Sequence, residues 1–232
     1  MQMVFTRNNI DRFLYLIAKD YKKHNKYADD IEIILVGGAS ILLNYNFREQ
    51  TMDLDAIIKA SSSIKDSINR VGDDNNLANH WLNSDFVKTV SYSVKLNQYS
   101  RFYKRFCNCL NVRTVSSEYL IAMKIKSARV YKHDLSDIIG IVKEQQELQQ
   151  DISYETIEKA YHELYGEDDR IPENMKMFLQ DIFKEPDLEE LFYSTKEEEY
   201  KNKQTVLKAE EQYGDVINDE NIQSFIEHFT KD

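Results

Sequence analysis

Two short groups of residues in this chain have the types and spacing needed to bind phosphate and a divalent metal ion. The first is the pair Gly37 and Gly38 with Ser40, which follows the apolar, β-branched run of residues 31–36. This pattern predicts a buried strand, a tight turn and a helix that begins near Ser40. Glycines in front of a helix N-terminus let a phosphate approach the free backbone N–H groups, so this turn is a candidate phosphate site.

The second group is the pair Asp53 and Asp55, which lies in the apolar segment 52–58. This segment is predicted to be the next strand, and because side chains alternate along a strand, the two carboxylates project from one face. Adjacent like charges destabilise an apolar strand unless a cation neutralises them, and carboxylates together with substrate phosphates suit Mg²⁺. We therefore expect this pair to hold Mg²⁺, or Mn²⁺ in its place. The alternative is that both carboxylates end a loop and lie in water.

These residues resemble the core motif of the nucleotidyltransferase fold, in which Gly-Gly or Gly-Ser precedes a helix and Asp-x-Asp lies on the next strand. More narrowly, the region from about residue 31 to residue 142 is similar to AbiEii-type and related toxin nucleotidyltransferases. The stretches that carry this resemblance are Val36-Gly-Gly-Ala-Ser-Ile-Leu-Leu, Arg48 and Thr51 ahead of Met-Asp-Leu-Asp, Trp81-Leu-Asn-Ser-Asp85, Tyr119-Leu-Ile-Ala-Met-Lys124, and Arg129 ahead of Lys132-His-Asp-Leu-Ser-Asp137.

The wider fold normally supplies a third carboxylate from a later strand. The two candidate strands, residues 90–96 and 110–115, contain no acid. In the toxin-like branch, the resemblance implies that a helical lysine and a downstream aspartate complete the site, and these map onto Lys124 and onto Asp134 or Asp137. The missing strand carboxylate also leaves open a non-catalytic nucleotide-binding or regulatory module of the same fold.

The residues around Lys124 agree with this assignment on independent grounds. Apolar residues flank Lys124 at helical spacing, so its ammonium group lies on a mostly apolar face and needs an anionic partner. Alternatively, the lysine stem covers the core while its charged end reaches water. Asp134 is also a plausible helix N-cap, with Asp137 in the first turn, and Asp85 is more simply a loop residue than a further acid of the site.

The resemblance implies an enzyme that moves a nucleoside monophosphate from a nucleoside triphosphate to an acceptor hydroxyl and releases pyrophosphate. Ser40 and the amides after Gly38 would hold the terminal phosphates, and Lys124 would neutralise the triphosphate. The toxin-like branch implies an RNA acceptor such as a tRNA 3′ end, or a protein target, together with an antitoxin partner. The alternative is an enzyme of the same fold that modifies a small molecule such as an antibiotic, with the acidic C-terminal part attracting a cationic acceptor.

A basic and aromatic segment between Asp85 and Glu118 contains no acid. It is a candidate for nucleic-acid contact, because cations bind the phosphate backbone and aromatic rings stack on exposed bases. Aromatic residues at this spacing also occur in protein cores. The candidate cations are Lys95, Arg101, Lys104 and Arg105.

The elements that must position these residues are mainly helical. Helices are predicted at about residues 9–24, 187–213 and 222–229, and amphipathic stripes lie at Ile157, Tyr161 and Leu164 and at Met175, Phe178, Leu179 and Ile182. The fold class is therefore α+β, with a small mixed β-sheet nucleotidyltransferase core flanked by helices and followed by a mostly helical, acidic C-terminal part.

Charge divides the chain near Gln150. Residues 1–150 hold 21 Lys and Arg against 17 Asp and Glu, a net of +4, and residues 151–232 hold 9 against 23, a net of −14, which together give the −10 of the chain. We predict a nucleotidyltransferase-like core at residues 1–150 and an acidic helical subdomain at residues 151–232. The run Glu197-Glu-Glu within the second part is interpreted as a solvated helix face.

Composition excludes several classes of protein. No stretch approaches the roughly 18 consecutive apolar residues of a membrane span, and residues 1–10 lack a signal-peptide hydrophobic region, so we expect a cytoplasmic protein without a membrane partner. Cys107 and Cys109 form a lone Cys-x-Cys, which argues against a zinc site and fits a reducing compartment.

Overall fold

The computed structural model describes residues 3–25, 30–60, 62–150 and 152–213, together with Ile222 and Ile226. The chain forms two compact units, of which unit 1 contains residues 1–123 and 157–170 and unit 2 contains residues 124–156 and 171–232. This division does not follow the change in charge near Gln150, because its boundaries fall inside helices α4 (Ser117–Ser127) and α6 (Tyr154–Tyr165) and between residues 170 and 171. None of the helices in the described ranges is long and apolar enough to cross a membrane.

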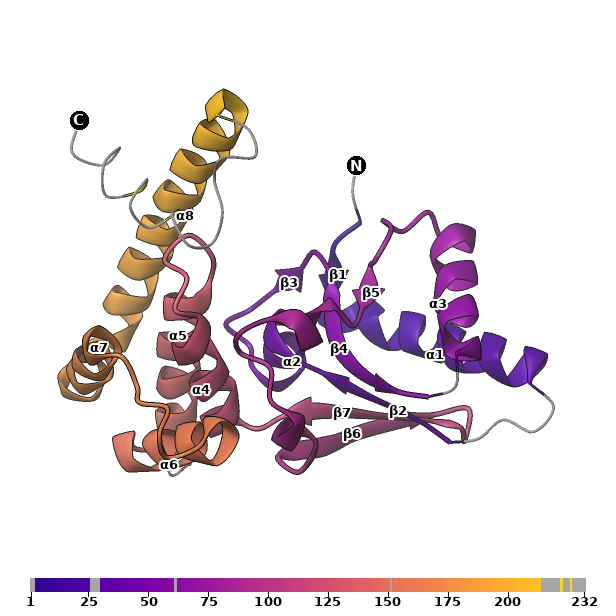
Figure 1. Ribbon diagram of the computed structural model, residues 1–232, viewed down its shortest axis with the longest axis horizontal. Helices are drawn as coiled ribbons and strands as arrows, with labels where there is room; N and C mark the ends of the chain where they lie inside the picture. The colour runs from indigo at the N-terminus through magenta and orange to yellow at the C-terminus, as the bar shows by residue number, and fades with distance from the viewer. Residues whose placement is uncertain are drawn as a thin grey trace. The chain divides into compact units, whose positions relative to one another are not determined.

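Unit 1 is built on a mixed five-stranded sheet with the strand order β5-β4-β2-β7-β6 (Figure 1). The strands are β2 (Ile31–Leu35), β4 (Leu54–Lys59), β5 (Leu82–Asn83), β6 (Ser100–Phe106) and β7 (Leu110–Val115). β2 runs antiparallel to β4 and parallel to β7, while β4 and β5 are parallel and β6 and β7 are antiparallel. A separate pair of short strands, β1 (Phe5–Thr6) and β3 (Gln50–Thr51), is antiparallel.

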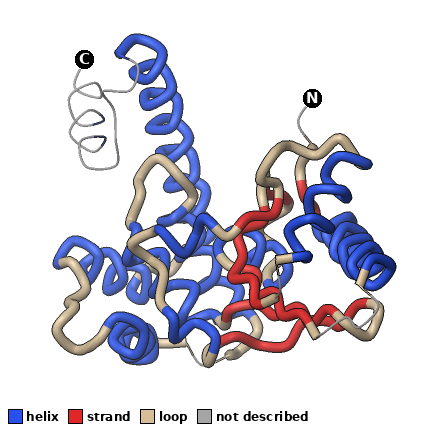
Figure 2. Tube along the Cα trace, turned by 45° about the vertical axis from the view of Figure 1, so that its right-hand side comes forward, coloured by secondary structure: helices blue, strands red, loops and turns tan. Residues whose placement is uncertain are grey.

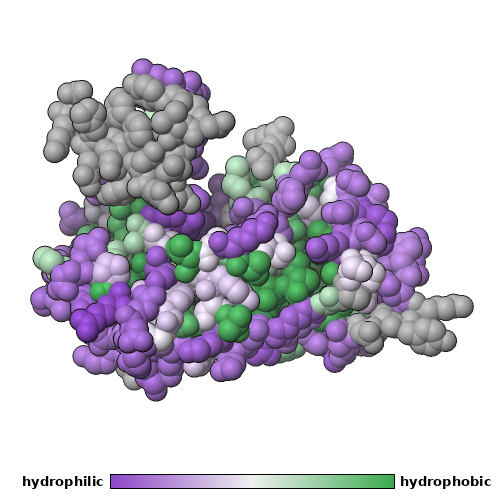
Figure 3. Space-filling view, in the orientation of Figure 1, coloured by the Kyte–Doolittle hydropathy of each residue, from purple (hydrophilic) through white to green (hydrophobic). Residues whose placement is uncertain are grey.

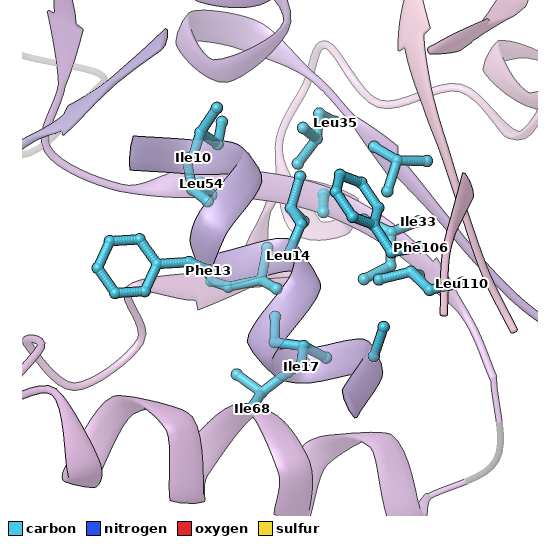
Figure 4. Packing of buried hydrophobic residues seen from close by; sticks show 14 of the residues in the cluster. Ile10, Phe13, Leu14, Ile17, Ile33, Leu35, Leu54, Ile68, Phe106 and Leu110 are labelled. Carbon is cyan, nitrogen blue, oxygen red and sulfur yellow. The ribbon is translucent and has the colours of Figure 1, made fainter. Parts of the chain in front are cut away.

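One face of the five-stranded sheet is covered by helices α1 (Arg7–His24) and α3 (Ser63–Asp74). Apolar side chains recur along α1 at helical spacing and meet alternate residues of the strands, as Figure 4 shows for Leu14 and Ile17 of α1 and for Ile33 and Leu35 of β2. The two periodicities, about 3.6 residues for the helix and two for the strand, therefore build the core together. The mixed sheet with its flanking helices confirms the predicted α+β class.

In the described residues of unit 2, helices are joined by turns and loops, and no strand occurs. The unit contains α5 (Asp134–Glu147), α7 (Glu173–Lys184) and α8 (Leu188–Tyr213), together with the ends of α4 and α6 that fall on its side of the boundaries. The tube drawing shows these segments as helices, with the strands confined to unit 1 (Figure 2). The predicted helix at about residues 187–213 is confirmed, whereas the helix predicted near residues 222–229 falls on residues of which only Ile222 and Ile226 are described.

The strand predicted at residues 90–96 is wrong. Residues 94–97 form a short 3-10 helix, and the strand of this region is β6 instead. The Ser93 hydroxyl accepts a hydrogen bond from the Lys95 N–H at 3.3 Å, and such a local bond offers the backbone an alternative to a sheet ladder. Neither β6 nor β7 carries an acid, so the third strand carboxylate of the wider fold is missing from both strands.

The surface in the view of Figure 3 is mainly hydrophilic, with a group of hydrophobic residues visible over the sheet of unit 1. Among the large apolar side chains that are exposed, Met52 lies beside Asp53 and Phe102 lies on β6. Both positions adjoin residues that the sequence singled out as candidates for chemistry or binding.

Gly72 of α3 lies against the indole of Trp81, the only tryptophan of the chain. A Cβ added at Gly72 would lie 2.8 Å from Trp81 Nε1, and this buried indole stacks on Phe5 and donates to the carbonyl oxygen of Ile68. We predict that the clash in Gly72→Ala lowers the free energy of unfolding by about 1–3 kcal/mol. The better helix propensity of alanine offsets about 1 kcal/mol of this loss.

Urea unfolding followed by tryptophan fluorescence measures this change. Asp73→Ala, at the adjacent exposed position, is the matched control and should unfold almost as the native chain does. A Gly72→Ala protein that is more stable than the native one would contradict the close contact between Gly72 and the Trp81 indole.

Candidate functional site

The predicted phosphate-binding turn begins helix α2 (Gly37–Asn44) at Gly37 rather than near Ser40. Gly37 has a φ of +51°, in the left-handed region that favours glycine. The first turn contains no acidic residue, and the N-cap residue Val36 provides no side-chain cap. Because the Ser40 N–H is the first to bond back to Val36, at 3.3 Å, the N–H groups of Gly37, Gly38 and Ala39 have no acceptor within the helix.

Asp55 lies directly beside this turn because β2 and β4 are antiparallel neighbours. The ladder places Leu35 opposite Ala56, and the N–H of Val36 donates to the carbonyl oxygen of Asp55 at 2.9 Å. Asp55 is half-buried, and strand alternation turns its side chain to the face opposite the core residues Leu54 and Ala56. The acidic strand and the start of α2 therefore meet at one point of unit 1.

Asp53 precedes β4 instead of lying in it, which corrects the predicted strand at residues 52–58. β3 ends at Thr51 in the two-stranded sheet, and the ladder of β4 with β5 starts at Leu54, so Met52 and Asp53 span the gap between the two sheets. Asp53 is exposed. Strand alternation therefore sets the direction of the Asp55 side chain but not that of Asp53.

Ser40 has a packing role in this structure. The residue is fully buried, and its hydroxyl oxygen accepts a hydrogen bond from the N–H of Val115 at 2.9 Å, which ties α2 to the end of β7. The residues of the turn that reach the surface are Gly37 and Gly38, both half-buried. A phosphate at this turn can therefore reach the backbone of the two glycines more easily than the Ser40 hydroxyl.

Arg48 also lies at this turn, although sequence reasoning assigned it no role in the site. A Cβ added at Gly38 would lie 2.9 Å from Arg48 Nη2 and 3.0 Å from Thr51 Oγ1, so the missing side chain lets the guanidinium approach the first turn of α2. A cation at the positive end of a helix is unfavourable by itself, and a bound anion would stabilise both charges. The available signal was the place of Arg48 and Thr51 in the stretch that carries the family resemblance.

The carboxylate of Asp55, with Asp53 two residues before it, fits Mg²⁺ better than a closed metal site does. Within the residues that the structure describes, no group of three or more His, Cys, Asp and Glu side chains is placed to hold a metal ion. Mg²⁺ commonly binds through one or two carboxylates and takes its other ligands from water and substrate phosphates, which matches the pair Asp53 and Asp55. A structural zinc site needs four protein ligands and does not fit.

The remaining predicted residues, Lys124, Asp134 and Asp137, come together within unit 2. Lys124 Nζ lies 2.8 Å from Asp134 Oδ1 and 2.7 Å from Asp137 Oδ2. The three side chains are 11%, 0% and 4% exposed respectively. The lysine therefore has the anionic partner that its apolar surroundings require, and its ammonium group is held by carboxylates instead of extending into water.

Asp134 is surrounded by hydrogen-bond donors. Besides Lys124, the Nε and Nη2 atoms of Arg129 donate to its carboxylate at 2.8 and 3.2 Å, and the backbone N–H of Arg129 donates at 3.1 Å. Burial disfavours ionisation of Asp134, but the charge of Lys124 and the hydrogen bonds from Arg129 outweigh burial and hold its pKa well below the ordinary value. Asp134 is therefore an anion that orients two cations. Arg129, like Arg48, was noticed in the sequence only as part of the resemblance.

The four cations predicted to contact nucleic acid fall into two classes. Lys104 Nζ lies 2.6 Å from a carboxylate oxygen of Asp11, and Arg105 Nη2 lies 2.8 Å from one of Asp30. These two cations are already neutralised by carboxylates of the same unit.

Lys95 and Arg101 form the second class. Both are exposed, and their side chains have no ion-pair partner among the residues that the structure describes. Phe102, next to Arg101 on β6, is 62% exposed. As far as the described residues show, this segment therefore offers a ligand the cations of Lys95 and Arg101 and the exposed ring of Phe102.

Asp85 lies two residues beyond β5, whose Asn83 is paired with Asp55 of β4. It opens a 3-10 helix (Asp85–Lys88) and pairs with Lys88 at 2.8 Å on the surface, as expected of a loop residue. It also lines a cavity of about 740 Å³ between α3 and residues 77–88. Asp53, Asp55, Gly37 and Gly38 do not line this cavity, although Asn83, the ladder partner of Asp55, does.

Comparison with known families gives a match over most of the chain. A family model described as "Nucleotidyltransferase of unknown function (DUF6036)" matches residues 12–185. Comparison with curated proteins and with solved structures gave no match. The matched range contains both groups of candidate residues and supports the nucleotidyltransferase fold, while the narrower resemblance to AbiEii-type toxins stays a prediction.

We predict that Asp134→Asn destabilises the protein by about 3–5 kcal/mol at neutral pH, because it removes a buried carboxylate from two cations. The folded-state pKa of Asp134 lies below its ordinary value of 3.8, so the carboxylate stabilises the folded state fully above that value. This stabilisation is lost as the pH falls from there towards the lower folded-state pKa. The difference in stability between the native chain and the variant should therefore narrow in acid.

Chemical denaturation at neutral and at acidic pH measures this difference. Glu147→Gln removes an exposed carboxyl group from the same helix and serves as the control, with an expected effect of less than about 1 kcal/mol. A gap for Asp134→Asn that stays constant or widens in acid would show that the ion pairs of Asp134 do not stabilise the fold.

Proposed function

Because the chain belongs to a family of nucleotidyltransferases, we propose that it transfers a nucleoside monophosphate from a nucleoside triphosphate to an acceptor hydroxyl. The observation that carries the proposal is the 2.9 Å hydrogen bond from the Val36 N–H to the Asp55 carbonyl oxygen, which joins the acidic strand to the residue before α2. A helix N-terminus that accepts phosphate and a carboxylate for a divalent ion are parts that phosphoryl-type transfer uses repeatedly.

In the proposed reaction, the acceptor oxygen attacks the α-phosphorus of the triphosphate. A bond forms between these two atoms, the bond from the α-phosphorus to the bridging oxygen breaks, and pyrophosphate leaves. The proton of the acceptor hydroxyl passes to a carboxylate or to water. The chemistry is mainly a matter of positioning the two reactants and stabilising negative charge, so charged and N–H groups carry it.

The residues of unit 1 are proposed to bind the metal and the triphosphate. Asp53 and Asp55 would hold Mg²⁺, which when bound neutralises charge on the phosphate oxygens. The N–H groups of Gly37 and Gly38 would donate to phosphate oxygens, and Arg48 would add a guanidinium that can bind two oxygens at once.

Within unit 2, Lys124 is proposed to be the cation that the family resemblance assigns to the nucleotide, and two carboxylates hold its ammonium group. Asp134 already accepts four hydrogen bonds, from Lys124 and three N–H groups of Arg129, so its role would be to orient the lysine. Asp137 also pairs with the lysine, and its proposed role is to orient Lys124 or to help to activate the acceptor hydroxyl.

We predict that Asp53→Ala combined with Asp55→Ala lowers nucleotide transfer on the order of 100-fold or more, because metal-held charge stabilisation is worth several kcal/mol. The assay incubates the chain with each labelled nucleoside triphosphate, Mg²⁺ and total cellular RNA, and a chelator should stop label transfer until Mg²⁺ is restored. Asp66→Ala combined with Asp74→Ala removes two charges from α3 and is the matched control.

The outcomes of this assay separate the candidate functions. Label on RNA with the native chain and the control, but not with the double Asp53 and Asp55 variant, supports the proposal. Label on protein instead redirects the acceptor. Nucleotide that binds without any turnover by the native chain would instead identify a non-catalytic module.

For the acceptor we propose RNA, on the strength of Lys95 and Arg101, which have no ion-pair partner within the described part of the chain, and of the exposed ring of Phe102. Cations that have no carboxylate partner can release counterions from a phosphate backbone, whereas Lys104 and Arg105 are held by Asp11 and Asp30. This sorts the four candidates into a test pair and a control pair.

We predict that Lys95→Ala combined with Arg101→Ala weakens RNA binding and reduces the slope of log K against log salt by about 1.4, or roughly 0.7 for each lost contact. Lys104→Ala combined with Arg105→Ala removes the same charge and should change the slope less. Filter binding across salt concentrations measures both pairs. Equal slopes for the two double variants would show that cations with and without carboxylate partners contact RNA alike. No RNA binding by the native chain would favour a small-molecule acceptor.

A further inference from the structure

The N-terminus of helix α5 is capped by a side chain from another helix. Glu199 of α8 is 2% exposed, and its Oε1 atom accepts hydrogen bonds from the N–H groups of Leu135 at 2.8 Å and Ser136 at 3.3 Å. Its Oε2 atom accepts the hydroxyl of Ser136. His133, the N-cap residue of α5, makes no side-chain cap of its own and lies 3.8 Å from Glu199. Glu199 therefore performs the capping that the local sequence does not.

This cap changes what the aspartates of α5 can do. An aspartate at the start of a helix commonly accepts hydrogen bonds from the free N–H groups of its own first turn, which is the role that the sequence offered for Asp134. With two of those N–H groups bonded to Glu199, the carboxylates of Asp134 and Asp137 bind cations instead, and Lys124 lies between them.

Glu199 belongs to a buried stripe along α8, which lies beside α5 in Figure 1. Asn202, one turn further on, donates to the carbonyl oxygen of Val130 at 3.0 Å, and Val206 packs in a cluster with Tyr131. The buried positions of the stripe are Leu188, Phe192, Glu199, Asn202, Val206 and Ala209. α8 therefore holds the segment between α4 and α5 as well as the first turn of α5.

The glutamate run was interpreted from the sequence as a solvated helix face. Glu197 and Glu198 are exposed, as expected, but Glu199 is buried against α5. Glu199 lies three residues before Asn202 and seven residues from both Phe192 and Val206, a helical spacing that distinguishes it from Glu197 and Glu198. A charged residue in such a stripe needs a hydrogen-bond partner, and the end of α5 supplies one.

We propose that Glu199 is a positioning residue for Lys124, because by capping α5 it leaves Asp134 and Asp137 available to hold the ammonium group. A role for Glu199 in catalysis depends on the proposed function, whereas its effect on the position of Lys124 does not. α8 begins at Leu188, beyond the residues 12–185 that match the family model, so the part of this chain outside the match contributes to its candidate site. The acidic C-terminal part thereby gains a specific role.

The test compares Glu199→Ala and Glu199→Gln with Glu198→Ala, which removes the same charge from the exposed neighbour. The full chain is treated with an amine-reactive acylating reagent, and modification of Lys124 is followed by mass spectrometry relative to Lys143 of α5. In Glu199→Ala the aspartates turn to the freed N–H groups and release the lysine, so its relative modification should rise on the order of tenfold.

The Gln variant distinguishes positioning from general loosening. Its amide oxygen still accepts hydrogen bonds from Leu135 and Ser136, so it should restore most of the protection of Lys124, and Glu198→Ala should match the native chain. Native protection of Lys124 in a folded Glu199→Ala protein overturns the proposal. An equal rise at Lys124 and Lys143 overturns it too, because it reports loss of the fold instead of loss of an ion pair.

Glu199→Asp decides the question where the alanine variant does not fold. It keeps the charge and withdraws the carboxylate from α5 by one methylene, so selective modification of Lys124 supports the proposal and native protection overturns it. Nucleotide transfer measured on the native chain and the same variants separates this proposal from the function. Selective modification of Lys124 in the Glu199 variants, together with a native chain that has no transferase activity, would support the positioning role while removing the proposed function.

Discussion

The antiparallel pairing of β2 with β4 is the contact on which the candidate site of unit 1 depends. Its register is set by apolar residues, because Ile33 and Leu35 on β2 and Leu54 and Ala56 on β4 all face α1 and α3. A slip by one residue would turn each of these side chains away from the core, so burial specifies the register strongly. The same register brings Asp55 to the start of α2, and the hydrophobic core thereby fixes the place of a polar site.

Unit 2 is organised by a different constraint, the need to pair buried charges. Lys124 and Arg129 are each bound to Asp134, and Asp137 also pairs with the lysine. Removing one member leaves a buried charge without its partner, which is far more costly than replacing the whole group by apolar residues. Replacing one member of this cluster therefore alters the ion pairs of the others. This holds even where only one member contacts a substrate.

Local patterns predicted the elements of this fold better than the contacts between them. The apolar run that became β2, the helical stripes of α1 and α7, and the need of Lys124 for a carboxylate all follow from spacing and burial within a few residues. β6 was missed because three of its seven residues are cations, of which Lys104 and Arg105 find partners in distant parts of unit 1. The bond of Ser40 to Val115, 75 residues away, and the cap of α5 by Glu199 also join distant positions, and no periodicity encodes them.

The position of β6 at the end of the sheet has a consequence for how molecules of this chain meet each other. An outer strand leaves a row of backbone groups that another chain could extend into an aggregate. Here the register of β6 shifts between Phe102 and Lys104, and its cationic side chains include two that carboxylates hold in place. At the opposite border, β5 has only two residues and gives little length to pair with. Both borders of the sheet are thus poor templates for polymerisation.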